Sequence, residues 1–143
     1  MYATAAAIFC PARSTRWVCP LFLAPVSAGF PSPAEDYIEG RLDLNKHLIK
    51  HPAATFFVRV AGDSMTGSGI HPGDILVVDR SIEPQDASVV IAVLDGELTV
   101  KRISRRGGRL YLVPDNSLYQ PLEILEGMEF EVWGVVTSVI HSL

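Results

Sequence analysis

The chain has 143 residues, of which 48% are hydrophobic and 20% charged, and its formal net charge is −4. This length fits one domain with or without an appendage, and the composition is that of a globular protein rather than a disordered one. The negative net charge argues against a nucleic-acid-binding domain, so no direct sequence-specific DNA binding is expected. The main basic cluster, KRISRRGGR at 101–109, surrounds a double-glycine turn and is expected to be a solvated hairpin tip.

Residues 1–28 form the first zone, which we expect to be an irregular, flexible arm. Its prolines prevent a long helix, and further prolines interrupt the uncharged stretch 17–34, so no membrane-spanning segment is expected. The chain's two cysteines, Cys10 and Cys19, both lie in this arm. A secreted domain that relied on disulfides would carry them in its body, so a reducing cytoplasm is the simpler interpretation.

The end of the arm reads VSAGFPSP, 26–33, and allows two interpretations. Val26 and Ala28 follow the apolar run CPLFLAPV, as small residues would at the cleavage site of an export signal. Two prolines inside that run and the absence of lysine upstream weaken this interpretation. The alternative is that the protein's own active site cuts the Ala28-Gly29 bond.

Residues 29–52 are expected to form a linker with a short helix. Ser32 followed by Glu35 fits a capping box, and Asp43 could equally cap the sequence LNKHLIKH at 44–51. A glycine between the two starts would weaken any longer helix, which favours the start at Asp43.

Residues 53–143 are dense in strand-forming residues and turn signals, and we expect a compact, mainly antiparallel β-domain. Asp95-Gly96 and Gly107-Gly108 are strong hairpin turns, and no long helical pattern separates the strands. The predicted strands are TFFVRVAG, DILVVD, SVVIAVL, ELTVKRI, RLYLVPD and EFEVWGVVTSVI.

Ser64 opens a glycine-rich loop, GDSMTGSGIHPGD at 62–74, directly after a predicted strand. Such a loop lets another backbone approach closely. Thr66 stands where a hydrolase elbow needs glycine, and no Gly-Lys-Ser/Thr sequence closes the loop as in a phosphate-binding loop. Taken alone, a serine in this setting is most often an ordinary turn residue.

A serine nucleophile needs a base, and the histidines are weak candidates. His71 and Asp74 lie in the same loop, where closeness in sequence says little about a triad. His47 and His51 have the spacing of helical zinc ligands but lack the glutamate of the zinc-protease motif, so surface positions are expected. No metal or cofactor is expected.

Lys101 is the other candidate base. Strand alternation places Thr99, Lys101 and Ile103 on one face of ELTVKRI, and both faces carry apolar residues that could desolvate the amine. To act near neutral pH its pKa must fall from ~10.4 to roughly 7–8, and burial among apolar side chains can lower it that far. A lone strand lysine is more often solvated.

Several motifs, in order and correctly spaced, resemble the LexA/UmuD family of Ser-Lys self-cleaving proteins (peptidase S24). They are GDSM, GIHPGDILVVD and DGELTVKR, with Lys101 placed 37 residues after Ser64. The segments GFPSPAEDYIEGRLDLNKHLIKHPAATFFV and VPDNSLYQPLEI resemble the UmuD branch in particular. The resemblance covers the chain from about Gly29 to its end, and the first 27 residues match poorly.

The resemblance implies that Ser64 is the nucleophile and Lys101 the general base. It places the oxyanion hole at the backbone N–H groups of Asp63 and Ser64, and the scissile bond at Ala28-Gly29. The domain division is then a removable arm (1–28), a linker with a short helix (29–52) and a self-cleaving β-domain (53–143).

The family also implies a bacterial, cytoplasmic homodimer that takes part in SOS mutagenesis. A RecA filament would promote cleavage, and the shortened form would join a UmuC-like Y-family DNA polymerase for translesion synthesis. The interpretation from another class is an exported β-domain binding protein whose signal peptide ends at Ala28. A LexA-type repressor is discounted, because the residues before the β-rich zone show no helix-turn-helix pattern.

Overall fold

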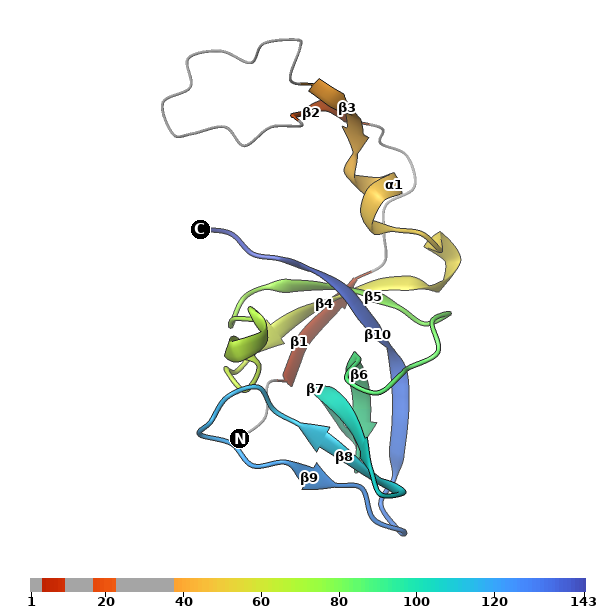
Figure 1. Cartoon of the computed structure of the whole chain (residues 1–143), viewed down its shortest axis with the longest axis vertical. Coiled ribbons are helices and arrows are strands. Elements are labelled where there is room, and N and C mark those ends of the chain that lie inside the picture. The colour runs from red at the N-terminus through yellow and green to blue at the C-terminus, as the bar shows by residue number, and fades with distance from the viewer. Residues whose placement is uncertain (1–3, 10–16, 23–37) are drawn as a thin grey trace. The chain divides into compact units, whose positions relative to one another are not determined.

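The computed structural model describes residues 4–9, 17–22 and 38–143 (Figure 1). The chain forms two compact units. One consists of Met1–Pro11 with His51–Leu143, and the other of Ala12–Lys50. None of the helices in these described parts combines the length and the hydropathy that crossing a lipid bilayer requires.

The smaller unit contains an antiparallel pair of strands, β2 (Val18–Phe22) and β3 (Ile38–Asp43), followed by helix α1 (Leu44–Leu48). Asp43 caps the helix, since its side chain accepts a hydrogen bond of 3.0 Å from the backbone N–H of Asn45. The predicted start at Asp43 is confirmed. The helix ends earlier than expected because Ile49 is already extended, and the alternative start at Ser32 lies outside the described residues.

The larger unit is built on one antiparallel sheet of eight strands, in the order β1-β4-β5-β10-β6-β7-β8-β9. This confirms the predicted mainly β, antiparallel fold. Two short 3-10 turns, Pro52–Ala54 and Thr66–Ser68, flank β4. The strands are β1 (Thr4–Phe9), β4 (Thr55–Ala61), β5 (Ile75–Asp79), β6 (Val89–Leu94), β7 (Glu97–Arg106), β8 (Arg109–Val113), β9 (Leu122–Glu123) and β10 (Phe130–Ile140).

Both predicted hairpin turns are present. Asp95 and Gly96 join β6 to β7 with φ values of 49° and 83°, the positive values that a tight hairpin turn requires. Gly107 and Gly108 join β7 to β8 in the same way, with φ values of 56° and 78°. The arginines of 101–109 that lie next to this turn are exposed, as expected of a solvated hairpin tip.

One end of the long sheet curls back onto β7, the third strand from the other end. β1 pairs along β4 and also meets β7 at Thr4 and Thr99, so that β1, β4, β5, β10, β6 and β7 form a ring closed at one residue pair (Figure 1). Apolar side chains fill the core within this ring. Its main cluster consists of Phe56, Val58, Val60, Met65, Ile70, Leu76, Val78, Ile91 and Val100.

The expectation that residues 1–28 are irregular is wrong for β1 and β2. The sequence of β1, TAAAIF, is rich in alanine, which is depleted in strands, and β2 contains a proline. Local preference therefore gives only a weak strand signal in either segment. Both strands form because a neighbouring strand offers its backbone N–H and C=O groups for pairing.

Candidate functional site

Ser64 lies just beyond the end of β4, at a turn that glycine permits. Gly62 has a φ of 86°, a left-handed conformation that side chains disfavour, and it turns the chain inward after Ala61. The side chain of Met65 then anchors the loop in the main core cluster. As a result Ser64 is fully buried, with 0% of its surface exposed.

Lys101 lies in the middle of β7 and is also buried, with 1% of its surface exposed. Its Nζ lies 2.8 Å from the Oγ of Ser64, 3.1 Å from the Oγ1 of Thr99 and 3.0 Å from the carbonyl oxygen of Val100. A protonated amine donates to all three oxygens. A neutral amine has a lone pair that can accept the hydroxyl proton of Ser64. The fold thus brings together two residues that are 37 positions apart in the sequence.

Burial also sets the protonation of this amine. Removal from water disfavours the charged form and lowers the pKa of Lys101 from 10.5 to about 7. Its three oxygen contacts are hydroxyls and a carbonyl, which carry no full negative charge to hold the proton. Near neutral pH a substantial fraction of Lys101 is therefore neutral, beside a serine hydroxyl.

The loop that carries Ser64 is held by the segment after β8. The backbone N–H of Asp115 donates to the carbonyl of Ser64 at 2.8 Å, and the Nδ2 of Asn116 donates to the carbonyl of Asp63 at 2.9 Å. The hydroxyl of Tyr119 donates to the carboxylate of Asp63 at 2.5 Å. A trans peptide is planar, so fixing the Asp63 carbonyl also fixes the N–H of Ser64, which points the opposite way. Sequence reasoning assigned no role to these three residues, since their contacts span 51 to 56 positions.

Gly67 marks the closest approach between these two segments. Its N–H donates to the carbonyl of Asp115 at 2.7 Å, and the neighbouring Ser68 hydroxyl donates to the Asp115 carboxylate at 2.6 Å. Arg102 on β7 in turn donates to the Ser68 hydroxyl at 2.8 Å. The loop that carries Ser64, the segment after β8 and strand β7 are therefore joined by one hydrogen-bonded network.

Replacing Gly67 with alanine is expected to lower the free energy of unfolding by about 1–3 kcal/mol, the usual effect of overpacking. The new Cβ would lie 2.7 Å from the backbone oxygen of Asp115, which the contacts to Ser64 and Ser68 hold in place. Denaturant unfolding measures the change. Gly40→Ala is the matched control, because no described atom lies within 4 Å of its Cβ, and a change within about 0.5 kcal/mol is expected. If both substitutions lowered the free energy of unfolding by the same amount, the close approach of Gly67 to Asp115 would be contradicted.

The histidines do not hydrogen-bond to Ser64 in the described structure: three of them lie beside aspartates, and the fourth is exposed. Asp74 accepts hydrogen bonds from the ring of His141 at 2.5 Å and from the backbone N–H of His71 at 2.8 Å. His51 contacts the buried Asp79 at 2.6 Å, and His47 is exposed on α1. Within the described ranges no three or more His, Cys, Asp or Glu side chains are placed to hold a metal ion. Lys101 is thus the titratable group placed at Ser64.

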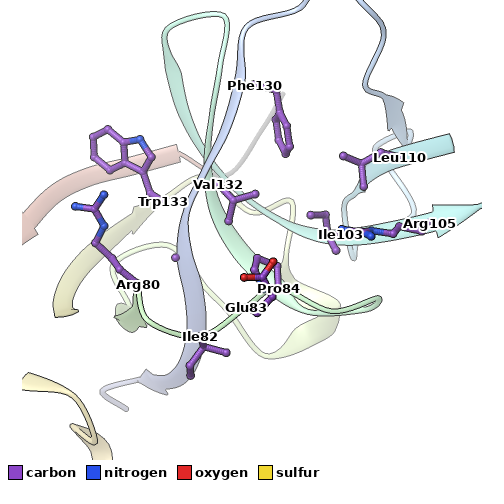
Figure 2. Close-up of a pocket in the computed structure, with 11 residues that line it drawn as sticks. Arg80, Ile82, Glu83, Pro84, Ile103, Arg105, Leu110, Phe130, Val132 and Trp133 are labelled. Atoms are coloured by element: carbon purple, nitrogen blue, oxygen red, sulfur yellow. The ribbon is translucent and has the colours of Figure 1, made fainter. Parts of the chain in front are cut away.

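The expected scissile bond, Ala28-Gly29, falls outside the described residues. A cavity of about 370 Å³ lies between β10, the β7–β8 hairpin and segment 80–84, with Trp133 and Phe130 among its lining residues (Figure 2). Its lining does not include Ser64 or Lys101.

Comparison with known proteins agrees with this architecture. The Peptidase S24-like family model matches residues 20–137. Protein SamA of Salmonella typhimurium is 49% identical over 132 residues, which cover 92% of this chain and 89% of SamA. Protein MucA of Escherichia coli is 46% identical over 125 residues, covering 87% of this chain and 83% of MucA. The LexA repressor of Colwellia psychrerythraea is 37% identical over 118 residues, covering 82% of this chain and 56% of that repressor.

The family match spans most of the chain and includes both the loop that carries Ser64 and strand β7. The relatives at 46–49% identity are UmuD-like proteins, in agreement with the resemblance seen in the sequence motifs. The chain therefore belongs to the peptidase S24 family of serine peptidases, in its UmuD-like branch.

Proposed function

We propose that this protein is an SOS mutagenesis factor that cuts its own chain at Ala28-Gly29 through a Ser64–Lys101 dyad. The observation that carries the proposal is the buried contact of 2.8 Å between the Ser64 hydroxyl and an amine whose pKa burial lowers to about 7. A base with a pKa near the working pH combines the correct protonation state with a useful driving force for proton transfer.

In the proposed reaction neutral Lys101 accepts the Ser64 proton as Oγ attacks the carbonyl carbon of Ala28. The N–H groups of Asp63 and Ser64 donate to the oxyanion of the tetrahedral intermediate. Collapse of the intermediate breaks the bond to Gly29, whose amine takes the proton from Lys101. Water then attacks the acyl-serine with Lys101 again as base, which releases residues 1–28 with a free carboxylate and restores the Ser64 hydroxyl.

The wider role follows from the UmuD-like branch. We place the protein in the bacterial cytoplasm as a homodimer that remains intact until a RecA filament on single-stranded DNA promotes cleavage. The filament need only favour the conformation in which the scissile segment occupies the site. The remaining chain, 29–143, then acts as an accessory subunit of a UmuC-like Y-family polymerase. It contributes no sequence-specific DNA contact and no membrane contact.

The test is the intact mass of the purified chain, incubated without added protease and with or without a RecA filament on single-stranded DNA. Release of a 1–28 fragment by the wild type, but not by Ser64→Ala, is the expected result. A chain that stays uncut under both conditions would overturn the proposed self-cleavage. Recovery of a chain beginning at Gly29 from the periplasm, with Ser64→Ala processed equally, would instead favour an exported binding protein.

A further inference from the structure

The N-terminal strand β1 occupies a defined position in the sheet. It pairs antiparallel with β4, from Thr4 opposite Ala61 to Phe9 opposite Phe57, and Thr4 also lies opposite Thr99 of β7. Figure 1 shows β1, in dark red, beside β4. Residues from the start of the chain therefore lie between the two strands that lead to the reactive pair.

This position is next to the dyad. Ala61 precedes Ser64 by three residues, and Thr99 precedes Lys101 by two. The hydroxyl of Thr99 is itself a hydrogen-bond partner of Lys101 Nζ. One end of β1 therefore lies among the residues that flank the nucleophile and its base.

A peptide segment that Ser64 attacks must occupy the position that β1 holds beside β4. Its scissile carbonyl carbon must come within ~3–3.5 Å of Oγ, and an extended peptide pairs with an available strand edge. The other edge of β4 pairs with β5, and the other edge of β7 pairs with β6 from Glu97 to Arg102. The edges that remain beside the dyad are those that β1 uses, and the side chains of Ser64 and Lys101 are 0% and 1% exposed.

The composition of β1 is that of a strand that binds weakly and can dissociate from the sheet. Three of its six residues are alanine, which offers little apolar surface for burial. Ile8 and Phe9 remain 45% and 43% exposed, and the pairing with β4 shifts register between Ala5 and Ala7. The structure shows backbone pairing along this strand, and its sequence has little apolar surface to bury.

We infer that the edge of β4 beside Ser64 is a peptide-strand binding site, and that β1 is its resident occupant, which the Ala28-Gly29 segment must displace before cleavage. The inference rests on the proposed function and names a regulation of the same site. If the state with β1 paired is favoured tenfold over the state with β1 released, the site is open for about a tenth of the time. Substitutions that abolish the pairing of β1 then raise the cleavage rate about tenfold.

The test uses the full-length chain with Ala5→Pro and Ala7→Pro together, because proline removes backbone donors from a strand. Ala12→Pro with Ser14→Pro, outside β1, is the matched control. Cleavage about tenfold faster in the β1 variant, with the control unchanged, is expected. A β1 variant that is cut at the parent rate or more slowly would overturn the inference.

A second measurement separates this inference from self-cleavage itself. In the uncleavable Ser64→Ala chain, a synthetic peptide of residues 22–34 is expected to bind about tenfold more tightly once both β1 prolines are present. Hydrogen exchange should show protected amides in residues 4–9 of the Ser64→Ala chain and loss of that protection in the proline variant. Equal peptide affinities, or unprotected β1 amides, would overturn the strand site. If both results hold but no chain ever cuts itself, the proposed function fails and the strand site stands.

Discussion

Replacing Lys101 with methionine is expected to slow self-cleavage by about a hundred- to ten-thousandfold, the usual contribution of a general base. Methionine keeps an apolar stem of similar length in the buried site but has no nitrogen lone pair to take the proton of Ser64, whose Oγ lies 2.8 Å from Nζ in the wild type. Ser64→Ala removes the nucleophile itself, so no acyl-enzyme can form. A time course of intact mass measures both variants.

The pH dependence gives this prediction a second readout. Only neutral Lys101 can act as the base, and burial lowers its pKa to about 7. The wild-type rate should therefore rise with pH through about 7 and level off above about 8. Lys46→Met, at an exposed position on α1, is the control and should leave the rate and its pH profile unchanged. A Lys101→Met chain that retains the wild-type rate would refute the dyad.

The free energy of unfolding is expected to rise with pH because of the same buried amine. The pKa of Lys101 is about 7 in the folded chain and near 10.5 when exposed, so between these values the unfolded chain binds more protons. Below pH 7 both states are protonated and the burial of charge destabilises the fold fully, by about 5 kcal/mol. The destabilisation is relieved as the pH rises from 7 to 10.5.

Denaturant unfolding of two uncleavable chains tests this linkage. Ser64→Ala with Lys101→Met is expected to be more stable than Ser64→Ala alone at pH 6.5. The difference should shrink by about 3 kcal/mol by pH 9.5, where Lys101 is neutral in the folded state and most of its burial penalty has gone. Adding Lys46→Met to Ser64→Ala instead should give a difference that does not change with pH. If the difference in the free energy of unfolding caused by Lys101→Met did not change with pH, the buried amine would not be the source of the pH dependence.

The sheet could be predicted because its strands carry their own signals. Runs of β-branched residues between 55 and 140, and glycines at the two hairpin turns, are local features that a single sequence displays. β1 could not be predicted in this way, because TAAAIF becomes a strand only through the edges of β4 and β7. The part of the fold that depends on distant partners was therefore the part that sequence patterns missed.

The site, like the fold, can be predicted from the sequence only where local patterns indicate it. Apolar residues on both faces of ELTVKRI indicated that Lys101 could be desolvated, and its pairing with Ser64 came from the family resemblance rather than from any local pattern. The hydrogen bonds from Asn116 and Tyr119 to Asp63 join segments more than 50 residues apart. Only the folded chain reveals that these side chains hold the loop that carries Ser64.

The position of β10 connects the two parts of the sheet that carry Ser64 and Lys101. β10 lies between β5 and β6, so the last strand of the chain joins the β4–β5 pair that leads to Ser64 with the β6–β7 hairpin that carries Lys101. The contact between Ser64 and Lys101 therefore depends on a strand that contains neither residue, and β1 adds a second connection by pairing with both β4 and β7.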